Sequence, residues 1–150
     1  MDVFDKKIGH LLLTNKKISP EQLKTLEQQS ENEKKPLKDV VVADNIASEQ
    51  ELAKMYGILI GVPYAEFNAK DIPKDVLKKI PEHIAKQYRM ILFDIDQETK
   101  AYLVAMEDPE DIQAVDTLQK IFGTNIRTYI STHSNISAGI VSAKSNKRLQ

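Results

Sequence analysis

Residues 90–106 read MILFDIDQETKAYLVAM, and this stretch sets the fold class. Two apolar β-type runs, 90–95 and 101–106, flank a polar turn at 96–99. Such a pattern predicts a β-hairpin with antiparallel strands. The connection is too short for the helical crossover that parallel strands require. A doubly wound parallel sheet is therefore not expected.

The segments on either side of the hairpin predict helices and one more strand. Short helices are expected at 71–79 and 82–88, because Pro81 disfavours a helical residue before it. After the hairpin, Asp108 is expected to cap a helix that Gly123 ends, and 125–130 forms a third β-type run. The two helices after the hairpin carry apolar residues at helical spacing: Ile112, Val115, Leu118 and Ile121 or Phe122, then Ile136, Ile140 and Val141. We predict an α+β fold whose small sheet has about three strands, with helices packed on one side of it.

The first half of the chain contains an internal repeat. Residues 8–26 and 37–55 match at an offset of 29. In each copy an apolar segment precedes a capping box, which begins at Ser19 in the first copy and at Ser48 in the second. The repeat predicts two helix–turn–helix units, each with an apolar face that it can bury only against the other.

These patterns divide the chain into three parts. We expect a helical subdomain at 1–68, an α+β subdomain at 69–143, and a polar tail or linker at 144–150. The basic tail also suits a nucleic-acid arm, but a frayed end or a linker to a following domain suits it better. The net charge of −1 gives no general attraction to nucleic acid.

Composition and local motifs point away from catalysis. The chain has no cysteine, and none of its five glycines lies in a phosphate-binding loop pattern. His10, His83 and His133 are far apart in sequence. The acidic cluster at 107–111 could bind a divalent ion, but helix capping explains it more simply. We therefore expect no catalytic residue, no cofactor and no metal site. The start lacks a signal-peptide pattern, and the longest apolar run, 58–62, is too short to span a bilayer, so we expect a cytoplasmic protein.

Several separated pieces together resemble one known family. They are 8–13 and 18–23 in the first copy, 52–64 at the end of the second, and 80–85, 104–109 and 122–126 in the second half. Their order and spacing are similar to those of the N-terminal, MshEN-type domain of the assembly ATPases of type IV pili and type II secretion machines. The resemblance covers about residues 6–141.

This resemblance implies two roles. One is docking the motor to cytoplasmic parts of inner-membrane platform proteins, which would hold the chain at the membrane through its partners. The other is binding cyclic di-GMP through a duplicated RLGxxL motif with later Gly, Leu and Gln positions. The family's Walker motifs are absent here, so the chain resembles a fragment or a free-standing relative without the motor.

The duplicated motif is degraded in this chain. The first copy has Lys7-Ile8-Gly9 where the family has Arg-Leu-Gly, and the second has Pro36-Leu37-Lys38. The later Gly positions hold Lys16 and Asn45. Since Lys and Pro lack the planar fork of Arg, nucleotide binding is expected to be weakened or lost. The residues that the resemblance places at a nucleotide site are Lys7, Ile8, Gly9, Leu12, Leu13, Gln29, Leu37 and Val41.

Overall fold

The computed structural model describes residues 2–144, and the chain forms two compact units that divide after Leu59. We expected the division at 68/69. The difference arises because the segment after Leu59 pairs with the sheet of the second unit. Ala65 N–H donates to Ile130 O at 2.8 Å, and Ile130 N–H donates to Pro63 O at 2.9 Å.

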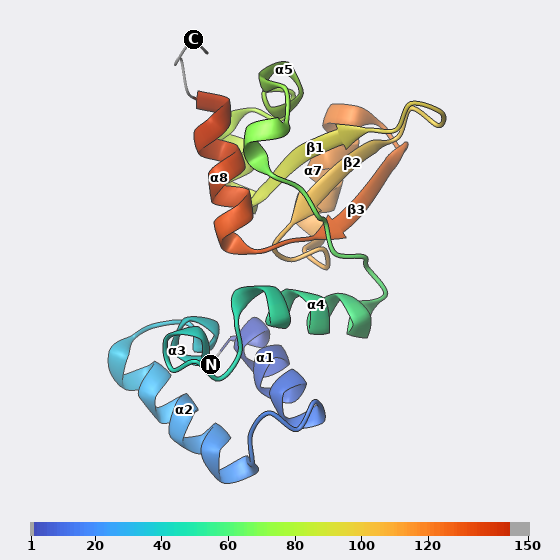
Figure 1. The fold of residues 1–150 in the computed structure, drawn as a ribbon. Helices are drawn as coiled ribbons and strands as arrows, with labels where there is room; N and C mark the ends of the chain where they lie inside the picture. Colours follow the sequence, from blue (N-terminus) through green and yellow to red (C-terminus); the bar gives the residue numbers. More distant parts are fainter. Residues whose placement is uncertain (1, 145–150) are drawn as a thin grey trace. The chain divides into compact units, whose positions relative to one another are not determined.

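The first unit is made of four helices (Figure 1): α1 (Val3–Thr14), α2 (Pro20–Glu33), α3 (Leu37–Ala43) and α4 (Glu49–Ile60). The capping box predicted at Ser19 is present, with Ser19 Oγ accepting from Gln22 N–H and Gln22 Oε1 accepting from Ser19 N–H. Ser48 and Glu51 make the same reciprocal pair of bonds at 3.0 Å each. The caps therefore define where α2 and α4 begin.

The helices α1 and α3 end in the same way, 29 residues apart. Lys16 and Asn45 adopt left-handed backbone conformations, with φ of 57° and 59°. In each copy the two N–H groups at the turn bond back to carbonyls of the last helical turn, which is the Schellman arrangement. The bonds are Lys16 N to Leu13 O, Lys17 N to Leu12 O, Asn45 N to Val42 O and Ile46 N to Val41 O. The sequence repeat is thus also a repeat of backbone geometry.

The second unit contains a three-stranded sheet in the order β1-β2-β3. The predicted hairpin is formed by β1 (Met90–Ile95) and β2 (Tyr102–Met106), which are antiparallel, with a bulge between Leu92 and Asp94. The helix α7 (Ile112–Phe122) then carries the chain to β3 (Ile126–Ile130), which lies parallel to β2. The sheet is therefore mixed, and α7 provides the crossover that its parallel pair requires.

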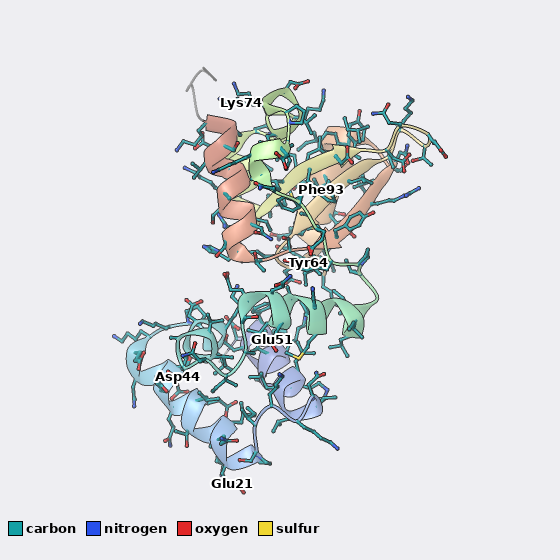
Figure 2. All side chains as sticks on the ribbon, viewed as in Figure 1. Glu21, Asp44, Glu51, Tyr64, Lys74 and Phe93 are labelled. Carbon is teal, nitrogen blue, oxygen red and sulfur yellow. The ribbon has the colours of Figure 1, made fainter. Side chains whose placement is uncertain are left out.

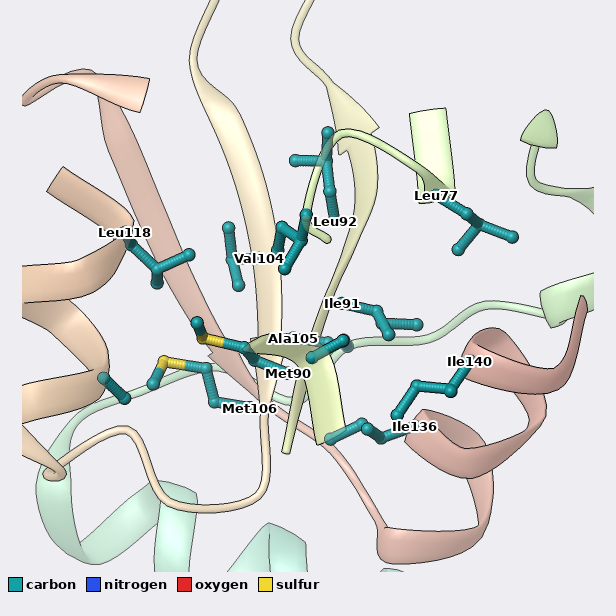
Figure 3. Packing of buried hydrophobic residues seen from close by; sticks show 14 of the residues in the cluster. Leu77, Met90, Ile91, Leu92, Val104, Ala105, Met106, Leu118, Ile136 and Ile140 are labelled. Atoms are coloured by element: carbon teal, nitrogen blue, oxygen red, sulfur yellow. The ribbon is translucent and has the colours of Figure 1, made fainter. Parts of the chain in front are cut away.

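Helices cover both faces of this sheet, so the expectation of helices on one side was wrong. The Phe122 ring of α7 stacks on Tyr102 with centroids 4.3 Å apart. The helix α8 (His133–Lys144) packs against Ile91, which pairs with Ala105. Since Tyr102 and Ala105 point to opposite faces of β2, α7 and α8 lie on opposite sides. Figure 3 shows side chains of the two helices reaching the strands from either side.

The remaining elements differ slightly from their predicted bounds. A 3₁₀ turn, η1 (Ala69–Asp71), and the short α5 (Lys74–Leu77) replace the single helix expected at 71–79, because Pro73 interrupts it. The helix α6 spans Glu82–Tyr88, as predicted. The helix α7 begins three residues later than expected, because Asp111 rather than Asp108 caps it by accepting from Ala114 N–H. Asp108 accepts from Glu110 N–H in the preceding turn.

The core of the second unit lies between the sheet and its helices (Figure 3). Leu118 of α7 and Ile136 of α8 are fully buried in it. Phe67, from the extended segment that follows Tyr64, stacks on Phe93 with centroids 5.3 Å apart, and Figure 2 labels Tyr64 and Phe93. Among residues 2–144, no helix is both long and apolar enough to cross a membrane.

Candidate functional site

Four of the residues that the resemblance places at a nucleotide site are core residues of the first unit. Ile8, Leu12, Leu37 and Val41 are at most 2% exposed. Ile8 and Leu12 lie on α1, and Leu37 and Val41 lie on α3, which packs against α1. Packing of these helices is sufficient to explain why apolar residues occupy these positions.

Gly9 is buried where α1 meets the other helices. A Cβ at this position would lie 3.1 Å from Leu23 Cδ1 and 3.8 Å from Leu37 Cδ2. The missing side chain therefore lets Leu23 of α2 pack closely on α1. Lys38, at the equivalent position of the second copy, is half-buried instead.

Lys7 contacts an aromatic pair that the sequence reasoning did not identify. Its Nζ donates to the Tyr56 hydroxyl at 3.3 Å and lies 5.6 Å from the centre of that ring. The Tyr56 ring meets Phe4 edge-to-face, with centroids 5.8 Å apart. On the other side, Lys38 Nζ lies 6.0 Å from the centre of the Phe4 ring. Lys7 and Lys38 thus each make a cation–π contact with this aromatic pair, whose Tyr56 ring is buried in the first unit.

One sequence signal could have indicated Tyr56. It follows Leu52 by four residues in the amphipathic α4, so it belongs to the buried face. Its hydroxyl then needs a polar partner, as buried tyrosines usually do. The identity of that partner as Lys7 depends on how α1 and α4 pack, which no local pattern encodes.

Asp5 connects α1 to the start of α3. Its Oδ1 accepts from Leu37 N–H at 3.0 Å, which caps α3, whose own N-cap residue is Pro36. Burial raises the pKa of the Asp5 carboxyl above its usual value, and the hydrogen bond from Leu37 partly opposes this. A buried carboxylate therefore fixes the second copy of the repeat onto the first.

Leu13 and Gln29 are the last two predicted site residues. Both are half-buried. Gln29 Nε2 donates to Glu33 Oε2 at 3.0 Å within α2. The structure therefore brings Lys7 together with Tyr56, Phe4 and Lys38, and it leaves Gln29 engaged in its own helix.

The second unit holds a separate polar cluster at the start of α8. Arg89 Nε donates to Glu107 Oε2 at 2.6 Å, and His133 Nδ1 lies 3.0 Å from the same oxygen. Arg89 Nη2 also donates to His133 O and to Ser137 Oγ. These contacts join the end of α6, the end of β2 and the first turns of α8. The residues from 2 to 144 contain no group of three or more His, Cys, Asp or Glu side chains that could hold a metal ion.

Comparison with known proteins identifies the family. The family model described as the MshEN domain matches residues 60–148. The chain belongs to the MshEN domain family. The match covers the second unit, and the helical repeat lies before it.

Two curated relatives extend the similarity of this MshEN protein over most of its length. They are the type IV pilus assembly ATPases PilB of Myxococcus xanthus and Thermus thermophilus, each 25% identical over 134 residues, or 89% of this chain. The match spans 23% of the first relative and 15% of the second. The chain therefore corresponds to less than a quarter of either protein.

Solved structures share the fold of both units. A structure of MshE with cdg has a TM-score of 0.68 at 20% identity, covering 89% of this chain and 96% of that one. The N-terminal domain of XpsE has a TM-score of 0.64 at 16% identity, covering 95% and 96%. The predicted family and fold class are thus confirmed.

Proposed function

We propose that this chain is a non-catalytic docking and regulatory domain of a type IV pilus or type II secretion assembly ATPase. It couples the motor to cytoplasmic parts of inner-membrane platform proteins and works on the cytoplasmic side of that membrane through them. The observation that carries this proposal is the match of nearly the whole chain to 23% or less of two PilB ATPases. If the ATPase motor lies in the rest of a longer chain, as the short match to the PilB ATPases suggests, the present domain is available to bind partners.

The sequence supports a binding role over a chemical one. The five glycines form no phosphate-binding loop, and the polar clusters around Arg89 and Asp111 are engaged in ion pairing and helix capping. These contacts stabilise the fold. A small domain with this composition is best suited to a function in which its surface binds another molecule.

The test is binding of the purified domain to the cytoplasmic domains of the platform proteins of the same machine, measured by calorimetry. We expect saturable binding by at least one of them. The domain unfolded in urea serves as the control for nonspecific association. If none of the platform proteins binds the folded domain, the docking proposal is overturned.

A second candidate function is sensing of cyclic di-GMP. It is favoured by the fold similarity to MshE, whose structure was solved with cdg, and by the position of Lys7 beside Tyr56. Against it, Ile8, Leu12, Leu37 and Val41 are buried in the core, and Lys38 replaces the second motif glycine. On balance we expect binding to be weak or lost.

Titration with cyclic di-GMP separates the two functions. Micromolar or tighter binding that is lost in Lys7→Ala and kept in Lys6→Ala would establish a sensor, since Lys6 is an exposed neighbour on the same helix. Absence of heat and of thermal stabilisation at millimolar nucleotide would leave the repeat as a scaffold.

A further inference from the structure

A pocket lies in the second unit between α5, α6 and α8. Its volume is about 210 Å³, which is below the roughly 300–1,000 Å³ of pockets that hold drug-sized ligands. Leu77, Ile91 and Ile140 line it from α5, β1 and α8, and Figure 3 shows these side chains on their three elements. The pocket therefore has room for a small molecule and offers it an apolar interior.

The rim of the pocket carries charged side chains, and one carboxylate there is already paired. Glu82 and Lys144 both line the pocket. Glu82 Oε2 lies 2.9 Å from Lys86 Nζ and 3.3 Å from Lys144 Nζ, so two ammonium groups share one carboxylate. Mainly the hydrogen bond from Lys86 holds the pKa of the Glu82 carboxyl below its usual value. Glu82 is therefore charged at neutral pH, and its charge is used by these two lysines.

Lys78 adds a further positive charge at the rim. It lines the pocket, it is exposed, and it follows α5 as its C-cap residue. Within residues 2–144 its ammonium group forms no ion pair. Lys78, Lys86 and Lys144 thus stand against the single carboxylate of Glu82. This excess of positive charge attracts an anionic group and repels a cationic one.

We propose that this pocket binds a small carboxylate that carries a short apolar chain, with the chain against Ile91 and Ile140 and the carboxylate beside Lys78. The apolar interior selects the chain, the charge of the rim selects the sign of the head group, and the volume limits the size. This site goes beyond the docking function and does not depend on it, because no partner protein takes part.

Hexanoate is the probe that tests the site. We expect saturable shifts of the NMR signals of the Gly139 amide and of the Ile91 and Ile140 methyl groups when the wild type is titrated with it. The affinity should be millimolar, because a ligand of so few atoms gains little binding free energy. Hexylamine keeps the chain and reverses the charge, whereas acetate keeps the charge and lacks the chain. Each should bind at least fivefold more weakly than hexanoate, and equal binding of either would overturn the proposal.

Three variants locate the ligand. Lys78→Gln should weaken hexanoate binding at least fivefold, whereas Lys79→Gln should change it less than twofold. Lys79 is an equally exposed neighbour that does not belong to the residues lining the pocket. Ala143→Leu places extra volume in the pocket from α8 and should abolish binding. Unchanged affinity in Lys78→Gln would overturn the proposal, and this exposed position can be changed without disturbing the core.

The remaining outcomes are equally decisive. Absence of saturable shifts in the wild type at millimolar hexanoate overturns the proposal and leaves the docking function standing. Failure of the platform proteins to bind overturns docking and leaves this site standing. Displacement of hexanoate by phosphatidylglycerol vesicles, but not by phosphatidylcholine vesicles, would identify a lipid as the occupant and overturn the assignment to a free small carboxylate.

Discussion

The carboxylate of Asp5 caps a helix that begins 32 residues later, by accepting from Leu37 N–H at 3.0 Å. Asp5→Ala removes this cap, and we expect a loss of about 1 kcal/mol in the free energy of unfolding. Asp5→Asn keeps an acceptor oxygen at the same place and should lose less. Urea unfolding of the three proteins at pH 7 measures both effects, and equal losses for alanine and asparagine would contradict a capping role.

The same carboxyl predicts a pH dependence. Its pKa is raised in the folded state, mainly by burial, so the folded protein binds a proton here more readily than the unfolded one. Relative to Asp5→Asn, the wild type should lose stability as pH rises from the ordinary Asp value, near 3.9, through the raised folded value. Urea unfolding of both proteins between pH 4 and pH 7 tests this. A wild type that gains stability relative to Asp5→Asn over that range would contradict it.

The left-handed turns after α1 and α3 predict a gain from glycine. Lys16 holds a φ of 57° with a Cβ that disfavours it, so Lys16→Gly should stabilise the domain by up to about 1 kcal/mol. Asn45→Gly should gain less, because Asn tolerates this conformation better. Lys16→Ala keeps the Cβ and serves as the control. A greater gain from alanine than from glycine in thermal unfolding would show that backbone conformation is not the cause.

Gly139 of α8 packs directly on β1. A Cβ there would lie 2.4 Å from Ile91 Cδ1, and Ile91 is buried. We expect Gly139→Ala to cost about 1–3 kcal/mol. Adding Ile91→Val removes the clashing methyl group, so the double variant should recover part of the loss relative to Ile91→Val alone. Additive losses in the double-mutant cycle would place the cause elsewhere.

The Arg89 cluster predicts an asymmetry between two neighbouring cations. Arg89→Ala leaves the mostly buried Glu107 without its guanidinium partner, and we expect a loss of about 1–3 kcal/mol. Lys86 pairs with Glu82 at 2.9 Å on the exposed side of α6, so Lys86→Ala should show no resolvable change. Thermal unfolding of both variants measures the contrast, and equal effects would argue against a structural role for the cluster.

Local patterns in the sequence predict much of this fold. The hairpin and the cap at Ser19 arise from contacts between residues close in sequence, and the third strand and the repeat are visible as apolar patterns in the sequence. The α7 cap shows the limit of such patterns, because Asp108 and Asp111 both suit an N-cap and only Asp111 caps the helix in the structure. The placement of α7 and α8 on opposite faces follows from the handedness and register of the crossover. The sequence predicted a sheet of about three strands but not how its third strand is connected.

The candidate site was less predictable than the fold. Motif matching selects positions such as Ile8 and Leu37, which the core requires in any case. The contacts of Lys7 with Tyr56 and of Lys38 with Phe4 join residues distant in sequence. Such pairs depend on how four helices pack, so they become visible only in three dimensions.

The hydrogen bonds between Ile130 and the 63–65 segment also have a consequence for folding during synthesis. Pro63 and Ala65 emerge from the ribosome long before Ile130. The first extended residues of the second unit therefore cannot form their hydrogen bonds until Ile130 has also emerged. Until then they are an exposed extended segment, the kind of species that aggregates during folding. Pro63 has no N–H, so this segment offers one donor fewer for pairing with another chain. The proline therefore lowers the tendency of the nascent chain to aggregate before β3 is made.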